Sequence, residues 1–208
     1  MSERRLLFVT AIAALVVSGI APHDRATWLL EVAPVLLALP LLLATARRFP
    51  LTPLACRLLF VHALILMVGG HWTYAEVPAG FWVRDHFGLA RNPYDRLGHL
   101  AQGFVPAVLA REVVVRCTPL RGRWLAFVAI AIPLAISAAY ELVEWAAALA
   151  FGQGADAFLG TQGDPWDTQW DMFLALVGAL AALLLVARVH DRQLALKEGT
   201  CEPTSLDS

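Results

Sequence analysis

Apolar stretches long enough to cross a lipid bilayer recur along most of the chain and constrain its fold more than any other feature. Crossing the hydrocarbon core takes about 20 mostly apolar residues. Hydrophobic residues make up 59% of the sequence and charged residues only 16%, against about 25% charged in soluble domains. We therefore predict an all-α, polytopic membrane helical bundle of about six transmembrane helices. The predicted spans are residues 6–21, 28–46, 54–74, 94–115, 124–151 and 165–189.

The positions of Lys and Arg predict which side of the membrane each loop faces, because cytoplasmic loops carry an excess of both. If the spans alternate in direction, only Arg25, Arg84, Arg91 and Arg96 fall on one side. The other 12 of the 16 Lys and Arg residues (16 − 4) fall on the opposite side. We therefore expect both termini to be cytoplasmic. A net charge of −1 argues against nucleic acid as a partner.

The sequence predicts one domain followed by a tail, and it allows two interpretations of the first apolar stretch. We expect a single transmembrane domain over residues 1–193 and a disordered cytoplasmic tail over residues 194–208. The first apolar stretch is short and follows Arg4 and Arg5, an arrangement that is also typical of a secretory signal peptide. The sequence leaves open whether this stretch is cleaved.

Acidic residues and one histidine occupy the outer ends of the last three predicted spans. Ionisable side chains in such places are costly and usually functional. Within each span the two members lie three or four residues apart, so they share one helical face. Alternating helix direction brings all three ends to the periplasmic side, where we predict one polar site. Its members are Asp95 and His99 on the fourth span, Glu141 and Glu144 on the fifth, and Asp167 and Asp171 on the sixth.

Part of this pattern also fits a structural role. Asn92 and Asp164 each precede a proline, as helix N-caps often do. Asp95 and Asp167 would then lie in the first helical turn, where the negative charge of an acid interacts favourably with the helix dipole. Capping does not explain the polar residues one turn deeper, and paired glutamates on one buried face repel unless a cation or a proton intervenes.

The residue types favour a divalent cation as cofactor. Carboxylates with one imidazole form a hard ligand set that suits Mg²⁺, Mn²⁺ or Ca²⁺, and also Zn²⁺ through the histidine. A metal would also allow an acidic pocket to hold a phosphate group. No HExxH, EF-hand or zinc-ribbon spacing is present. The expected metal ligands are Asp95, His99, Glu144, Asp167 and Asp171, and the expected catalytic residues are Glu141 and Glu144.

Three blocks in the second half of the chain carry a family resemblance. They are residues 94–104 (YDRLGHLAQGF), 140–145 (YELVEW) and 159–172 (LGTQGDPWDTQWDM). In this order they resemble the YjdF-like family of uncharacterised bacterial inner-membrane proteins. That family has no assigned activity, so the resemblance implies little chemistry. It does imply a location, as a multi-pass protein of the bacterial inner (cytoplasmic) membrane.

A more distant similarity is to VanZ-like membrane proteins, which are associated with resistance to glycopeptide antibiotics. Their pattern has Gln where this chain has Glu144 and Asn where it has Ala175, which weakens any transfer of function. The matching positions are Asp95, Arg96 and His99, then Glu141 and Glu144, then Asp171, Ala175 and Gly178.

Three functions are compatible with these observations, and the sequence does not decide whether the protein is an enzyme. The first is a metal-assisted membrane enzyme that acts on a lipid or lipid-linked phosphate. The second is a non-catalytic membrane partner whose acids hold its helices together. The third is a small ion-coupled transporter with Glu141 and Glu144 as cation or proton carriers, although no inverted repeat supports it. We rank them in this order.

Overall fold

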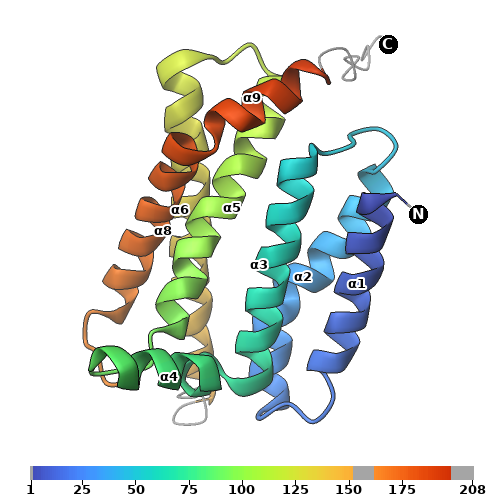
Figure 1. Ribbon diagram of the computed structural model, residues 1–208. Helices are drawn as coiled ribbons and strands as arrows, with labels where there is room; N and C mark the ends of the chain where they lie inside the picture. The colour runs from blue at the N-terminus through green and yellow to red at the C-terminus, as the bar shows by residue number, and fades with distance from the viewer. Residues whose placement is uncertain (1, 152–161, 198–208) are drawn as a thin grey trace.

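The computed structural model describes residues 2–151 and 162–197, and all regular structure in these two ranges is helical. Its long helices lie side by side and alternate in direction (Figure 1), which confirms the predicted helical bundle. They are α1 (Glu3–Ser18), α2 (Arg25–Thr45), α3 (Pro53–Trp72), α5 (Tyr94–Cys117), α6 (Gly122–Phe151) and α8 (Asp167–Leu185). The shorter elements are η1 (Tyr74–Glu76), α4 (Pro78–Phe87) and α9 (Ala187–Ala195).

Four helices among the described residues, α2, α3, α6 and α8, are long and apolar enough to span a membrane. The other two long helices differ for separate reasons. Helix α1 has only 16 residues, whereas α5 has 24 residues with charged groups near both ends. The outer surface of the bundle is strongly apolar, with Leu37, Leu142 and Leu184 exposed to 73%, 63% and 83%. Such a surface is stable only against lipid.

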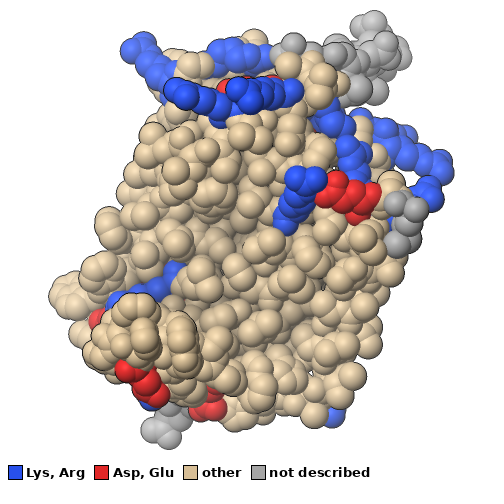
Figure 2. All heavy atoms as spheres, in the orientation of Figure 1, with Lys and Arg blue, Asp and Glu red and all other residues tan. Residues whose placement is uncertain are grey.

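The two ends of the bundle differ in charge. The start of α1 and helix α9 lie at one end of the bundle (Figure 1), and Figure 2 shows Lys and Arg gathered there, with a broad uncharged surface below them. We call this end the basic end and the opposite one the site end. The distribution is typical of the positive-inside rule; that the basic end faces the cytoplasm stays a prediction.

A buried carboxylate, Glu112 of α5, holds the basic end together. It accepts hydrogen bonds from the Thr52 backbone N–H (2.8 Å) and hydroxyl (2.6 Å) and from Arg116 Nη1 (3.1 Å). His190 Nε2 of α9 lies 3.1 Å from Glu112 Oε2, the oxygen that also accepts the Thr52 hydroxyl. Glu112 and His190 are both fully buried, so this network fixes α9 against α5 and the start of α3.

Helix α9 overlaps the first two residues of the predicted tail, residues 194–208, and the tail as a whole stays a prediction. Helix α9 continues to Ala195, and Leu194 is buried at 3% exposure. Helix α9 is polar on average and buries only a short face. Its amphipathic pattern was therefore not recognised in the sequence. Residues 198–208, which carry the rest of that prediction, lie outside the described residues.

Helices α5 and α8 pack closely because glycines lie at their crossing. A Cβ added at Gly103 would overlap the Ala175 carbonyl group, and one added at Gly178 would overlap that of Leu100. Small residues allow helix backbones to approach in membranes, where no hydrophobic effect drives helices together. The site ends of α5 and α8 are therefore held side by side.

Helix α4 lies across the site end of the bundle (Figure 1), and glycines again decide how the chain packs there. Tyr74 lies between α3 and α5, since a Cβ at Gly98 would come within 2.7 Å of its ring and one at Gly69 would overlap it. Gly80 of α4 leaves room for the buried side chain of Asn92. The segment before α5 is thereby held against α4.

The predicted N-caps are wrong by one and two residues. Helix α5 begins after Pro93, not Asn92, and α8 begins after Trp166, not Asp164. The side chains of Asn92 and Asp164 instead each accept the backbone N–H of the second residue along, at 3.1 and 3.0 Å. Asn and Asp favour such a turn as readily as a cap, so the sequence signal was ambiguous.

Candidate functional site

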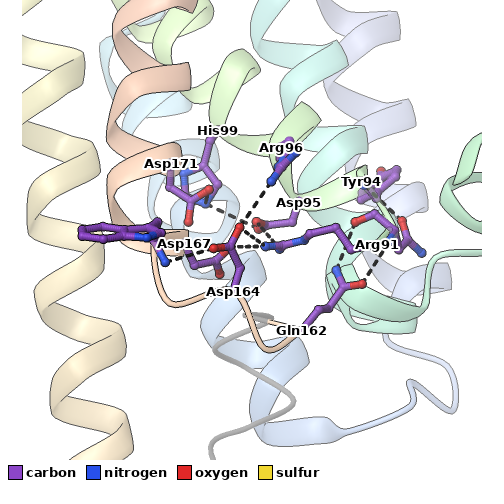
Figure 3. A network of polar contacts seen from close by, with 11 residues as sticks. Arg91, Tyr94, Asp95, Arg96, His99, Gln162, Asp164, Asp167 and Asp171 are labelled. Atoms are coloured by element: carbon purple, nitrogen blue, oxygen red, sulfur yellow. Dashed lines mark hydrogen bonds and ion pairs between the residues drawn. The ribbon is translucent and has the colours of Figure 1, made fainter. Parts of the chain in front are cut away.

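The close packing of α5 and α8 brings Asp95, His99 and Asp171 together at the site end (Figure 3). His99 Nε2 lies 3.4 Å from Asp95 Oδ1 and 3.7 Å from Asp171 Oδ1. One ligand atom from each of the three residues lies within 4.8 Å of the others. All three are buried, with exposures of 8%, 7% and 2%. We call them the three-residue group.

Three atoms of this group are buried without a hydrogen bond to any part of the chain that the structure describes. They are Asp95 Oδ2, His99 Nδ1 and Asp171 Oδ1. Leaving such an atom unsatisfied costs about 1–3 kcal/mol. A cation among the three residues would satisfy the aspartate oxygens. Two carboxylates and one imidazole suit Mn²⁺, Zn²⁺ or Fe²⁺ and leave coordination positions for other ligands, so the residues fit a divalent metal.

Arg91 balances the neighbouring acids. Its guanidinium contacts the Asp167 carboxylate closely, and it lies 3.6 Å from Asp164 and 3.5 Å from Asp95. Its side chain is only 9% exposed, so these charges meet away from water. Of the predicted metal ligands, Asp167 thus lies beside the three-residue group and faces an arginine.

Two further contacts fix the segment that leads into α8. Arg96 Nη2 lies 3.4 Å from Asp164 Oδ2. Gln162 exchanges a pair of hydrogen bonds with the Asn92 backbone, at 2.9 and 3.0 Å (Figure 3). The start of α5 and the segment before α8 therefore form one connected unit around the three-residue group.

A cavity of about 820 Å³ lies beside the group, between α1, α2 and α3 on one side and α5 and α6 on the other. Its walls are mostly Leu, Val, Phe and Ala side chains. Polar residues gather toward the site end, namely Glu31, Tyr74, Asp95, His99, Tyr140 and Glu144. Tyr140 donates a hydrogen bond to the Leu30 carbonyl (3.1 Å), which joins α6 to α2 there.

The predicted catalytic glutamates lie next to the three-residue group, not within it. Glu144 lines the cavity with Asp95 and His99, so its side chain belongs to the protein interior and not to the lipid-facing surface. Glu141 is 8% exposed and contacts Thr168 at the start of α8. Three helices therefore contribute acids to one region; that this region is a functional site stays a prediction.

Residues 3–192 match a family model described as "Predicted membrane protein (DUF2238)". The chain belongs to this family. It is also 60% identical over 187 residues to the inner membrane protein YjdF of Escherichia coli (strain K12), an alignment that covers 89% of this chain and 90% of that protein. No solved structure matches the chain.

Membership in the DUF2238 family confirms the resemblance that the second half of the chain carries and extends it over nearly the whole chain. Together with the apolar helices, it identifies the chain as a multi-pass protein of the bacterial inner membrane. The family description names no substrate or reaction, so function has to be argued from the site.

Sequence reasoning missed three residues at this end. Arg91 was counted only as a loop base, although it lies four residues before Asp95 and so close to the helix start. Glu31 is a lone acid within an otherwise apolar span and is 6% exposed; the rule that singled out the later acids would also have found it. Tyr74 carries no such signal, since aromatic residues are common at helix ends.

Proposed function

We propose that this protein is a metal-dependent enzyme of the inner membrane that acts on a lipid or lipid-linked phosphate at the periplasmic surface. One observation carries the proposal. Two members of the three-residue group, Asp95 and His99, line a large, mostly apolar cavity. A hydrophilic centre beside an apolar cavity is what chemistry on an amphipathic substrate requires.

Each residue of the site would have a distinct role in this reaction. Asp95, His99 and Asp171 would hold a divalent cation, which would supply a Lewis acid for phosphate oxygens and lower the pKa of a bound water. Glu144, which lines the same cavity, would take up the proton of the attacking water as general base. Glu141 lies behind it against Thr168 and would support the position of α6 relative to α8.

Phosphate release in proteoliposomes tests this proposal. The protein would be reconstituted with phosphatidate or a polyprenyl diphosphate, with added Mn²⁺, Mg²⁺ or Zn²⁺ or with EDTA. We expect metal-dependent release that His99→Ala and Glu144→Gln abolish. Glu76→Gln is the matched control, because Glu76 is exposed at the same end of the bundle. Phosphate release that EDTA does not reduce and that persists in the His99→Ala variant would refute the proposal.

A non-catalytic membrane partner is the second candidate, and the ion pairs favour it. Arg91 pairs directly with Asp95, Asp164 and Asp167, as expected of a purely structural network. This candidate predicts that Glu141→Gln combined with Glu144→Gln lowers the unfolding temperature. A double variant that stays as stable as the wild type but loses metal-dependent phosphate release would exclude it.

A further inference from the structure

Two carboxylates that face the cavity come from different helices and lie at similar depths. Glu31 is six residues into α2 from Arg25, and Glu144 is seven residues from the end of α6 at Phe151. At 1.5 Å per residue, both lie about 10 Å from the site end of their helices. Both line the cavity.

Neither glutamate has a cation as partner among the ion pairs of residues 2–151 and 162–197. Three basic groups at the site end make their ion pairs with aspartates, namely Arg91, Arg96 and His99. Glu31 packs instead against Gly70, where an added Cβ would come 3.1 Å from its own Cβ, and against Tyr74. The cavity therefore contains two carboxyl groups that take part in no ion pair of the described chain.

His99 gives an independent indication of a ligand. It lines the cavity at 7% exposure, and its Nδ1 atom has no hydrogen-bond partner within the described ranges. A buried imidazole nitrogen needs such a partner. A polar group of a bound molecule would supply it, close to the two glutamates.

The shape and lining of the cavity describe what that molecule looks like. Carboxylates with the rings of Tyr74 and Tyr140 nearby favour a cationic head, since ammonium groups bind to acids and to aromatic faces. From this end the cavity continues between apolar walls to Arg4 and Arg47 near the basic end. A hydrocarbon chain fits such walls, and it would follow the direction of lipid chains in the outer leaflet.

We propose that the cavity binds an aminophospholipid of the outer leaflet, with its ammonium group between Glu31 and Glu144 and an acyl chain along the apolar walls. The inference rests on the proposed function in one respect: the phosphate of this lipid would be the group that reaches Asp95 and His99. It thereby names the substrate class of that reaction: water would add to the phosphorus of a phosphodiester, and the ethanolamine or diacylglycerol oxygen would leave with a proton. Recognition of the amine does not depend on the metal.

Binding of lyso-phosphatidylethanolamine and lyso-phosphatidylglycerol with the same acyl chain tests the inference. Native mass spectrometry or calorimetry of the purified full-length protein in detergent would give both affinities. We expect the wild type to bind the ethanolamine lipid about tenfold more tightly or better, because the charge pair is formed away from water. Equal affinities for the two lipids would overturn the inference.

Two glutamine variants test where the ammonium group of the lipid binds. Glu31→Gln and Glu144→Gln keep the side-chain size and should each remove most of the preference for the ethanolamine lipid, whereas the exposed control Glu76→Gln should keep it. A preference that survives both substitutions overturns the inference. If Glu31→Gln does not fold, Glu144→Gln and the wild-type comparison of the two lipids still decide.

Repeating the lipid-binding measurements in the presence of EDTA tests this inference separately from the proposed function. We expect the lipid preference to persist without metal, since the glutamates and not the metal recognise the amine. A protein that binds no metal but keeps the preference would refute the proposed enzyme and leave the amine site standing. A protein that binds metal but shows no lipid preference would do the reverse.

Discussion

His99 Nε2 of α5 lies 3.7 Å from Asp171 Oδ1 of α8, so two helices that are far apart in sequence share one buried polar site. The distance depends on the glycines at the crossing below, which allow the two backbones to approach. The site is thus a consequence of helix packing and not of a local motif. Perturbing the packing should perturb the site.

Gly178→Ala should separate α5 from α8. The new Cβ would overlap the Leu100 carbonyl group, and backbone cannot move aside as a flexible side chain can. We expect a loss of about 1–3 kcal/mol in the free energy of unfolding, measured by thermal unfolding in detergent. Gly19→Ala is the control, because its Cβ would meet only the Trp28 side chain, at 3.0 Å. Equal stability of the two variants would contradict the packing argument.

Arg91→Gln should destabilise the site end strongly. The arginine side chain is 9% exposed and serves Asp95, Asp164 and Asp167 at once, so its removal leaves buried acids uncompensated. Breaking a buried pair on one side costs about 3–5 kcal/mol, which denaturant unfolding would detect. Adding Asp167→Asn to the variant should restore part of the loss. If Arg91→Gln alone leaves stability unchanged, the network has no structural role.

Glu112→Gln should loosen α9 at the basic end. The amide can no longer accept every bond that the carboxylate accepts from Thr52, Arg116 and His190. We expect faster hydrogen exchange in α9, followed by mass spectrometry. Asp191→Asn is the control: that side chain is 60% exposed in its pair with Arg111, and exposed pairs contribute about 0–1 kcal/mol. Unchanged exchange in α9 would contradict the predicted anchoring.

The helices and their convergence could be predicted because both follow from local patterns. Apolar runs of sufficient length fix the spans, and alternation of direction then fixes which ends meet. His99 and Asp171 were found because each lies one turn inside a predicted span, where capping gives no explanation. Glu144, which was singled out because it is an acid inside a span, lines the cavity.

What the sequence could not show depends on contacts between distant segments. Nothing local distinguishes Arg91 from the other loop arginines; only the fold brings it to Asp167. Glu112 and His190 likewise meet over 78 positions of sequence. The helix starts were misplaced because Asn92 and Asp164 form turns that use the same residue types as caps.

Metal content of the purified protein tests the central claim most directly. After incubation with Mn²⁺ or Zn²⁺ and removal of unbound ions, elemental analysis should find about one divalent ion per wild-type chain. His99→Ala and Asp171→Asn should retain none, while Asp85→Asn should match the wild type, because that carboxylate is 66% exposed on α4. A wild-type protein without bound metal, whose unfolding temperature ignores both EDTA and added ions, would contradict the claim.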